Sequence, residues 1–356
     1  MLNQIVTIGS HQVGDGHPPL FLPDIGTFFN QDLAIAFDLI DKVASAGLPL
    51  VKGEVLHDPS ICLDTDLTDQ ISSRSLLTTR ENYRRLIERK VLSLGTYERL
   101  FAHARNRGLG LVLSVYDSEG LDFAITQDVL LIKIASSNIC HRPLIERAAR
   151  SGRPTMVDSG GATLDEVVRA ARWYVESGGS QLILEYSPPA PPAPVSLHKL
   201  KYLALLKHLF GCPVGLSDHH SGDEMLYAAL ALGAAVVEKG ISPDELSWEQ
   251  DLAHSLPVSL LQETALKCRN VHEGLSSDFS DLWSQRVGHL ARMGLIATRE
   301  LQSGHVLTLE DIGYAFPALG IGVEHYASVI GGSVISTVAR GEPIVWSNLS
   351  HLGAVE

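Results

Sequence analysis

The chain has 356 residues and a mass of 38.5 kDa, which predicts two domains or one large barrel with an addition. Hydrophobic residues make up 45% of the sequence and charged residues 19%, so extensive disorder is excluded. The net charge of -13 repels phosphate backbones and anionic lipid. We therefore expect neither nucleic acid nor a membrane surface as a partner.

The cysteines and the apolar segments favour a reducing compartment. Cys62, Cys140, Cys212 and Cys268 lie far apart in the sequence and form no CxxC pair, which is typical of cytosolic proteins. The first residues show no basic segment followed by an apolar run. The longest apolar stretch, residues 225–237, is shorter than the about 20 residues of a membrane span. We expect a soluble cytoplasmic protein.

Short apolar segments alternate with amphipathic stretches over residues 1–274, as parallel strands alternate with helices. Many of the helical stretches end at a glycine, as a left-handed C-cap requires. Eight strands, each followed by a helix, are the elements of a (β/α)8 TIM barrel. The expected strands are Leu20–Ile25, Leu48–Lys52, Gly110–Tyr116, Val129–Ile134, Pro154–Asp158, Gln181–Tyr186, Val214–Ser217 and Val236–Glu238.

A doubly wound open sheet is the alternative α/β fold, but no GxGxxG turn follows the first expected strand. Polar residues also gather where the expected strands end, among them Asp24, Lys52, Lys133 and Glu238. In a barrel these ends meet at one rim, which is where catalysis takes place. We therefore prefer the barrel.

Other segments depart from the barrel pattern. The insertion 53–90, with an expected helix around 79–89, has the length of a functional loop or lid. Residues 187–194, SPPAPPAP, form a stiff proline-rich loop. We expect a barrel domain over 1–274, a linker over 275–288 and a small glycine-rich, β-biased domain over 289–356.

Several segments, in the correct order, resemble the sialic acid synthase family. The clearest are LLIKIASSN, CPVGLSDHHSG, LGAAVVEKG and, near the C-terminus, IATRELQSGHVLTLEDI. The last resembles the antifreeze-like (SAF) domain of that family. Its members condense phosphoenolpyruvate with an N-acetylated hexose to make nonulosonic acids. The resemblance implies a barrel, a SAF domain and a swapped homodimer in which the C-terminal domain packs over the partner's active site.

The resemblance also implies a site for phosphoenolpyruvate, whose phosphate and carboxylate need lysines and hydroxyl donors. An alternative for the two lysines at strand ends is a salt bridge to Asp24, Glu185 or Glu238. The positions that we expect to contact substrate are Lys52, Lys133, Ser136, Ser159, Gly160, Glu185, Ser217, Asp218, Lys239 and Phe316.

In this family a divalent metal polarises the aldehyde, and its ligands are one histidine in an SDH motif and one in an EKH motif. His219 keeps the first, whereas the second motif ends in Gly240. Because a catalytic metal generally needs about three protein ligands, we expect Glu238 and Asp251 to join His219; Glu185 and His220 are further substitutes. Carboxylate with imidazole favours manganese or magnesium. The alternative is that His219 is an ordinary barrel residue and no metal binds.

The positions on the acceptor side differ from the family pattern. Glu-Ile-Gly-x-Asn-His is replaced by residues 24–29, DIGTFF, and the histidine of the family's HCTSxYP loop is Glu185. The family's Arg-Pro pair in the C-terminal domain reads Phe316-Pro317, so a planar cation is missing. We expect an acceptor that is more apolar, or one that carries a cation facing Glu54 and Glu185.

The leading hypothesis is an aldol-type condensation of phosphoenolpyruvate with a sugar-like aldehyde, with release of phosphate. Asp24, His219 and Glu238 are the expected catalytic residues. A second hypothesis is a barrel that has lost catalysis and binds a metabolite or a partner protein. A third is a lyase or isomerase that acts on a phosphorylated or 2-oxo acid.

Overall fold

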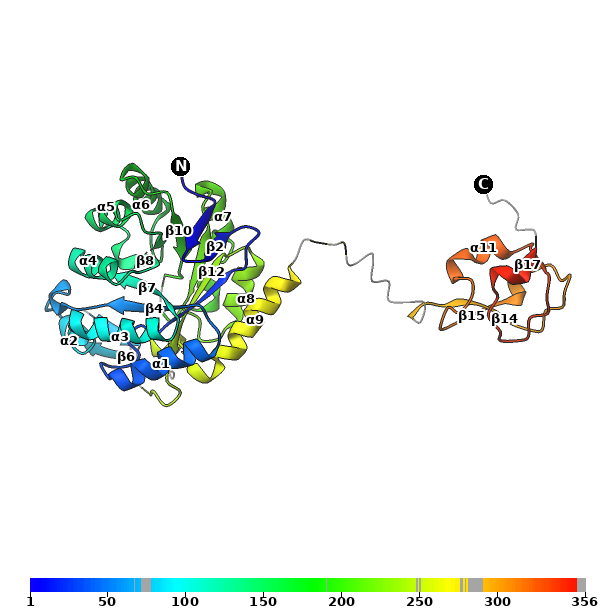
Figure 1. Ribbon diagram of the computed structural model, residues 1–356, viewed down its shortest axis with the longest axis horizontal. Coiled ribbons are helices and arrows are strands. Elements are labelled where there is room, and N and C mark those ends of the chain that lie inside the picture. Colours follow the sequence, from blue (N-terminus) through cyan, green and yellow to red (C-terminus); the bar gives the residue numbers. More distant parts are fainter. Residues whose placement is uncertain are drawn as a thin grey trace. The chain divides into compact units, whose positions relative to one another are not determined.

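The computed structural model describes residues 1–66, 68–71, 78–189, 191–247, 249, 251–275, 278, 280 and 291–350. The chain divides into two compact units, Met1–Leu275 and Ser276–Glu356, which are described separately (Figure 1). Most of the expected linker 275–288 lies outside the described residues. None of the described helices is long and apolar enough to cross a membrane.

The first unit is a closed barrel of eight parallel strands surrounded by helices (Figure 1). Each barrel strand pairs with the next one along the chain, and the last pairs with the first to close the ring. This confirms the predicted (β/α)8 fold. The strands are β3 (Leu20–Asp24), β4 (Leu50–Val55), β7 (Gly110–Val115), β8 (Leu131–Ile134), β9 (Thr155–Asp158), β10 (Leu182–Tyr186), β11 (Val214–Asp218) and β12 (Val236–Ser242).

The helices pack their apolar faces against the outside of the barrel. In the first of them, Ala36, Leu39, Ile40 and Val43 are buried, which is the i, i+3, i+4, i+7 spacing of one helix face. The helices of this unit are α1 (Leu33–Ser45), α2 (Tyr83–Glu88), α3 (Leu94–Asn106), α4 (Ser118–Thr126), α5 (Arg142–Arg150), α6 (Leu164–Glu176), α7 (Tyr202–Phe210), α8 (Glu224–Ala231) and α9 (Leu261–Gly274).

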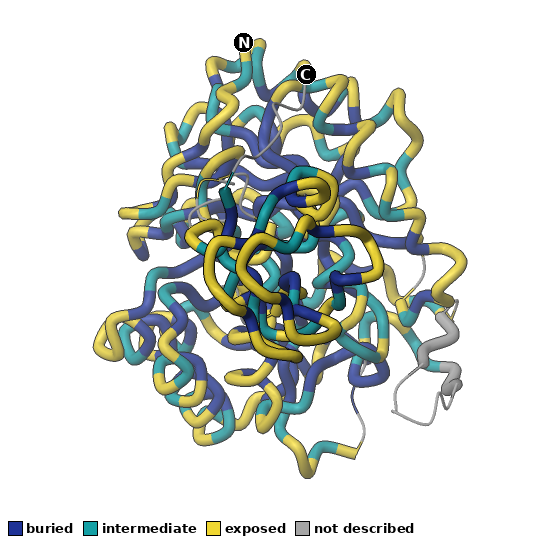
Figure 2. Tube along the Cα trace, turned by 90° about the vertical axis from the view of Figure 1, so that its right-hand side faces the viewer, coloured by how far each residue is buried: buried dark blue, intermediate teal, exposed yellow. Residues whose placement is uncertain are grey.

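A hairpin that the sequence analysis did not predict closes the N-terminal end of the barrel. It consists of β1 (Ile5–Ile8) and β2 (His11–Gly14). Its buried Val6, Ile8 and Val13 pack with residues near the starts of the barrel strands. In the tube view the interior segments are buried and the outer turns are exposed (Figure 2). The carboxyl ends of the strands, at which TIM barrels place their functional groups, lie at the opposite end.

The expected helix around 79–89 is partly wrong. Residues 78–81 form strand β6 (Thr78–Glu81), paired with β5 (Thr68–Ile71), and the helix α2 begins only at Tyr83. The side chain of Asn82 accepts a hydrogen bond from the backbone N–H of Arg85 and caps the helix. Asparagine is a preferred N-cap, so Asn82 marks the boundary between the strand β6 and the helix α2.

The second unit is small and rich in β-structure, as predicted. It contains β14 (Gly294–Ala297), β15 (Ile312–Ala315), β16 (Ser333–Val334), β17 (Leu349–Ser350) and the short helix α11 (Tyr326–Val329). Asp311 is fully buried beside its apolar core. Its carboxylate accepts hydrogen bonds from Arg299 Nε at 2.8 Å, from His305 Nε2 at 2.8 Å and from the backbone N–H of Thr308 at 2.9 Å.

We predict that Asp311→Asn destabilises this unit by about 2–4 kcal/mol, because it leaves buried donors facing a neutral group. Burial alone raises the pKa of Asp311, but His305, Thr308 and Arg299 outweigh it and hold the pKa below its ordinary value of 3.8. The stabilisation is therefore complete above about pH 4 and is lost as the pH falls through the folded-state pKa.

The measurement is limited proteolysis of the full chain, with cleavage sites within 291–350 mapped by mass spectrometry. At neutral pH the Asp311→Asn protein should be cut at least about 10-fold faster there. The exposed neighbour variant Glu310→Gln serves as the control and should match the unchanged chain. Equal cleavage of the Asp311 and Glu310 variants would contradict the assignment.

Candidate functional site

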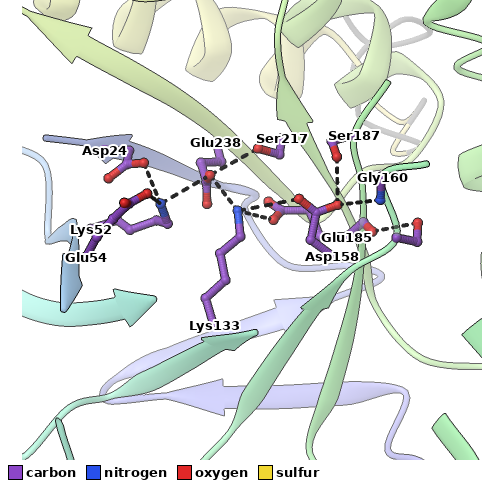
Figure 3. A network of polar contacts seen from close by, with 11 residues as sticks. Asp24, Lys52, Glu54, Lys133, Asp158, Gly160, Glu185, Ser187, Ser217 and Glu238 are labelled. Atoms are coloured by element: carbon purple, nitrogen blue, oxygen red, sulfur yellow. Dashed lines mark hydrogen bonds and ion pairs between the residues drawn. The ribbon is translucent and has the colours of Figure 1, made fainter. Parts of the chain in front are cut away.

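Charged side chains from six barrel strands converge at the carboxyl ends of the strands (Figure 3). Their burial is unusual because isolated charges are costly away from water. Each of the charged groups is less than about a tenth exposed. They are Asp24 on β3, Lys52 on β4, Lys133 on β8, Asp158 on β9, Glu185 on β10 and Glu238 on β12.

Lys133 lies at the centre of this cluster. Its Nζ is 2.6 Å from Glu238 Oε1, 2.7 Å from Glu185 Oε2 and 3.9 Å from Asp158 Oδ2. Burial alone lowers the pKa of Lys133, but the charges of Glu185 and Glu238 outweigh it and place the pKa well above its ordinary range. Lys133 is therefore a fixed cation within the barrel mouth.

Lys52 is the second fixed cation. It forms an ion pair with Asp24, and its Nζ lies 3.5 Å from Glu238 Oε1 and 3.9 Å from Glu54 Oε1. Burial lowers the pKa of Lys52, but Asp24 and Glu238 raise it to about 12. Burial also raises the pKa of Asp24 to about 6, although Lys52 opposes this. The salt bridges proposed for both lysines as an alternative are thus present.

Glu238 joins the two lysines. Its Oε1 accepts hydrogen bonds from Lys133 Nζ at 2.6 Å and from Ser217 Oγ at 3.0 Å, and Lys52 approaches the same atom. Burial raises the pKa of Glu238, but Lys133 and Lys52 outweigh it and lower the pKa to about 2. Glu238 is therefore ionised at neutral pH and holds the lysines in place.

Glu185 differs from Glu238 in the direction in which its pKa is shifted. It is fully buried, and burial, followed by the charge of Glu238, raises its pKa well above the ordinary range despite Lys133. Neither of its oxygens has a hydrogen-bond partner of good geometry among the described residues. Burial and the charge of Glu238 therefore favour the protonated form of Glu185, and a protonated carboxyl group can donate a hydrogen bond to an anion without repelling it.

The segment after β9 forms a tight polar corner beside Lys133. The backbone N–H of Gly160 donates to Asp158 Oδ1 at 3.0 Å, and Ser187 Oγ donates to the same atom at 2.8 Å. A Cβ at position 160 would lie 2.1 Å from Ser187 Oγ and 3.2 Å from the Cβ of Ser136. The position needs glycine, and the predicted Ser136 and Gly160 are neighbours. Ser159 Oγ instead donates to the backbone carbonyl of Glu185.

Asp218 and Lys239, two further predicted substrate contacts, bind each other. Lys239 Nζ is fully buried and donates to Asp218 Oδ2 at 2.8 Å and to the carbonyl oxygen of Gly222 at 2.8 Å. Successive strand residues point to opposite faces, so Lys239 points away from the side on which Glu238 lies. These contacts fix the loop after β11 rather than offering charges to a ligand.

His219 lies beside His254, a residue that the sequence analysis did not single out. The two ring centroids are 4.8 Å apart, and the Nδ1 atom of each ring is buried without a hydrogen-bond partner among the described residues. Burial lowers the pKa of His219 to about 4 and that of His254 to about 3, so both rings are neutral. The charge of Asp251 also acts on His219.

The predicted metal set does not assemble. In the described part of the chain, no three His, Cys, Asp or Glu side chains lie together in a way that could hold a metal ion. Of the predicted ligands His219, Glu238 and Asp251, Glu238 is engaged by lysines instead. A Cβ at position 240 would lie 3.0 Å from the ring of Phe28, so a second imidazole there would require that ring to shift.

The remaining predicted residues lie elsewhere. Phe316 belongs to the second unit, where its side chain is 60% exposed. Phe29 is 1% exposed and part of the core between barrel and helices, so it packs rather than lining an acceptor pocket. The role of Phe316 and the swapped homodimer stay predictions.

Comparison with protein families decides the ancestry. The model of the NeuB family matches residues 39–279, more than half of the chain, and that of the SAF domain matches residues 292–350. The chain belongs to the NeuB family. The resemblance of the sequence to sialic acid synthases with a C-terminal SAF domain is thereby confirmed.

This NeuB-family protein is similar over most of its length to several synthases of sialic acid and related sugars. The N,N'-diacetyllegionaminic acid synthase of Campylobacter jejuni is 24% identical, with 88% of this chain and 94% of the relative covered. The N-acetylneuraminate-9-phosphate synthase of Homo sapiens is also 24% identical, covering 94% and 93%. The N-acetylneuraminic acid (sialic acid) synthetase structure from Leptospira borgpetersenii has a TM-score of 0.69 at 20% identity, covering 81% of this chain and 98% of that one. The structural likeness shows a shared fold.

We predict that Lys239→Met lowers the free energy of unfolding of this NeuB-family barrel by about 3–5 kcal/mol, because it leaves Asp218 as an uncompensated buried charge. Adding Asp218→Asn should restore part of that loss, since the two residues act as a pair. The measurement is urea unfolding followed by the far-ultraviolet circular dichroism of the helices.

Lys267 provides the control, because it lies on α9 with its side chain 46% exposed and pairs only with surface acids. Lys267→Met should change the free energy of unfolding by less than about 1 kcal/mol. A loss in Lys239→Met no larger than this would show that the buried pair does not stabilise the loop after β11.

Proposed function

We propose that the chain condenses phosphoenolpyruvate with an aldehyde in an aldol-type reaction that releases phosphate. The observation that carries the proposal is the pair of buried cations, Lys52 and Lys133, which contact the same oxygen of Glu238 at the catalytic end of the barrel. Oxyanions bind to fixed cations and hydroxyl donors. The named relatives, which are synthases of nonulosonic acids, support the same reaction class.

When phosphoenolpyruvate binds, side chains that now contact the carboxylate of Glu238 would contact the substrate instead. Lys133 and Ser217, now engaged with Glu238, would each turn a hydrogen bond toward the phosphate or carboxylate oxygens. Glu185 in its neutral form would donate a further hydrogen bond there. Gly160 packs closely against Ser187 and Ser136, so the hydroxyl of Ser136 is a further donor that we assign to the oxyanion.

The reaction forms a carbon–carbon bond and breaks one carbon–oxygen bond. Carbon 3 of phosphoenolpyruvate attacks the aldehyde carbon, and the aldehyde oxygen takes up a proton. Water adds at carbon 2, and the bond from carbon 2 to the phosphate oxygen breaks, which leaves a 2-oxo acid and free phosphate. Asp24, whose pKa is raised to about 6, lies in the range in which a carboxyl group exchanges protons at neutral pH.

The acceptor side favours a polar group near Asp24 and Glu54. Glu54 is half-buried, and its carboxylate interacts with the hydroxyl of Tyr116. Because burial and Glu238 favour the protonated form of Glu185, Glu54 carries most of the expectation of a cationic acceptor. The ring of Phe28 beside Gly240 supplies an apolar wall.

We predict that Lys133→Gln weakens phosphoenolpyruvate binding at least about 100-fold, because a charge-assisted contact is lost and Glu238 faces the anion unneutralised. Ser217→Ala, which leaves every charge in place, should weaken binding by about 10-fold. The measurements are calorimetric titration with phosphoenolpyruvate and release of inorganic phosphate in a screen of aldehydes.

Lys267→Gln on the surface of α9 is the matched control and should bind as the unchanged chain does. Phosphoenolpyruvate affinity that is unchanged in both site variants would end the synthase proposal. Binding without phosphate release from any aldehyde would instead support a barrel that has lost catalysis. Phosphate release without an aldehyde would support a lyase.

His219 and His254 offer two of the about three protein ligands that a catalytic divalent cation generally needs. We propose that His219 and His254 hold it, because their two unpartnered Nδ1 atoms are buried and their ring centroids are 4.8 Å apart. A zinc–imidazole bond of about 2.0–2.1 Å allows two rings at that separation to share one ion. Imidazole ligands favour zinc, nickel or iron over magnesium. When bound, the cation would polarise the aldehyde oxygen as a Lewis acid.

We predict that the metal-stripped protein binds one Co²⁺ with an absorption band in the visible region. His254→Ala and His219→Ala should each weaken binding at least about 10-fold, because each removes one of two imidazole ligands. His220→Ala is the control, since His220 pairs with Glu224 at 3.1 Å. A visible band that survives in His254→Ala but not in His219→Ala would refute the pair.

A further inference from the structure

A cavity of about 510 Å³ lies at the N-terminal end of the barrel. Its walls are the turn of the β1–β2 hairpin, the loops that lead into β3 and β4, and one face of α9. A volume of this size accommodates a small organic ligand. None of the residues that line it belongs to the candidate functional site.

The cavity is separated from that site by the length of the strands. Leu20 opens β3 at the cavity, and Asp24 ends the same strand in the charged cluster. Four residues at about 3.3 Å each place the two positions about 13 Å apart. Pro49, which lines the cavity, immediately precedes β4. A ligand in the cavity would therefore bind apart from the reacting groups.

Small residues on α9 produce the hollow. Ala265, Cys268, Arg269 and His272 line it at the spacing that places residues on one helix face. Ala265 and Cys268 are buried but too small to fill the space above them. Burial raises the pKa of the Cys268 thiol to about 12, so this group is an inert part of the wall.

The polar part of the lining contains donors and no acid. Arg269, His11, His17, His272, Ser10 and Gln12 line the cavity. No Asp or Glu does, although the chain as a whole has 41 acidic residues against 28 Lys and Arg. Within the part of the chain that the structure describes, Arg269 forms no ion pair.

We propose that this cavity binds a small organic anion with an apolar body. The guanidinium group of Arg269 would take the anionic head, a carboxylate, phosphate or sulfonate, because its planar donors match such oxyanions. The apolar body would lie against Phe21, Leu48 and Pro49, which form the opposite wall. Because no acid lines the cavity, an anion there meets no carboxylate at contact distance, although the chain as a whole is acidic.

The probe is 8-anilinonaphthalene-1-sulfonate, which combines a sulfonate with an aromatic body and fluoresces when it leaves water. The full chain should show saturable binding to one site. Arg269→Glu should weaken that binding at least 10-fold, and Gln12→Glu, which adds an acid at the exposed rim, should weaken it several-fold. Arg172→Glu on the exposed face of α6 is the matched charge-reversal control and should bind as the unchanged chain does.

Both site positions are exposed, so these variants retain the core, and a urea unfolding curve checks that they do. Benzoate should displace the probe, whereas inorganic phosphate at the same concentration should not, since it has no apolar body. Equal probe affinity in Arg269→Glu and Arg172→Glu would overturn the proposal. So would the absence of saturable binding, and displacement by phosphate as effective as by benzoate would overturn the role of the apolar wall.

Discussion

Two buried ammonium groups that share one carboxylate oxygen determine what the barrel mouth can do. Lys52 on β4, Lys133 on β8 and Glu238 on β12 come from strands on different sides of the ring. Each charge is tolerated away from water only because the others are present. The three charges therefore stabilise one another only in the closed barrel, whose mouth holds the two cations side by side (Figure 3).

The same network shifts the pKa values of the two neighbouring glutamates in opposite directions. Lys133 and Lys52 lower the pKa of Glu238, whereas burial and the charges of Glu238 and Asp158 raise the pKa of Glu185, which has only Lys133 to oppose them. When two carboxyl groups of one site have different surroundings, their pKa values differ, and one can act as an acid while the other acts as a base. Lys239 and Asp218 repeat the pairing on the other face of the strands, where it fixes a loop instead.

Much of this architecture could be predicted, because parallel strands covered on both faces are nearly continuous apolar runs. Polar residues after such runs also predicted which side chains converge. The β1–β2 hairpin was missed because four-residue strands give too little periodicity. His254 was missed because its importance comes from contact with His219 on another loop. The raised pKa of Glu185 depends, after burial, on Glu238, which is 53 positions away in the sequence.

The contact between Gly240 and Phe28 has a consequence for how this chain can change over time. A side chain at 240 would press on the Phe28 ring, so a histidine gained there is unfavourable while Phe28 remains, and replacing Phe28 alone would leave a gap beside Gly240. The two positions are therefore coupled: what residue 240 can be depends on where the ring of residue 28 lies.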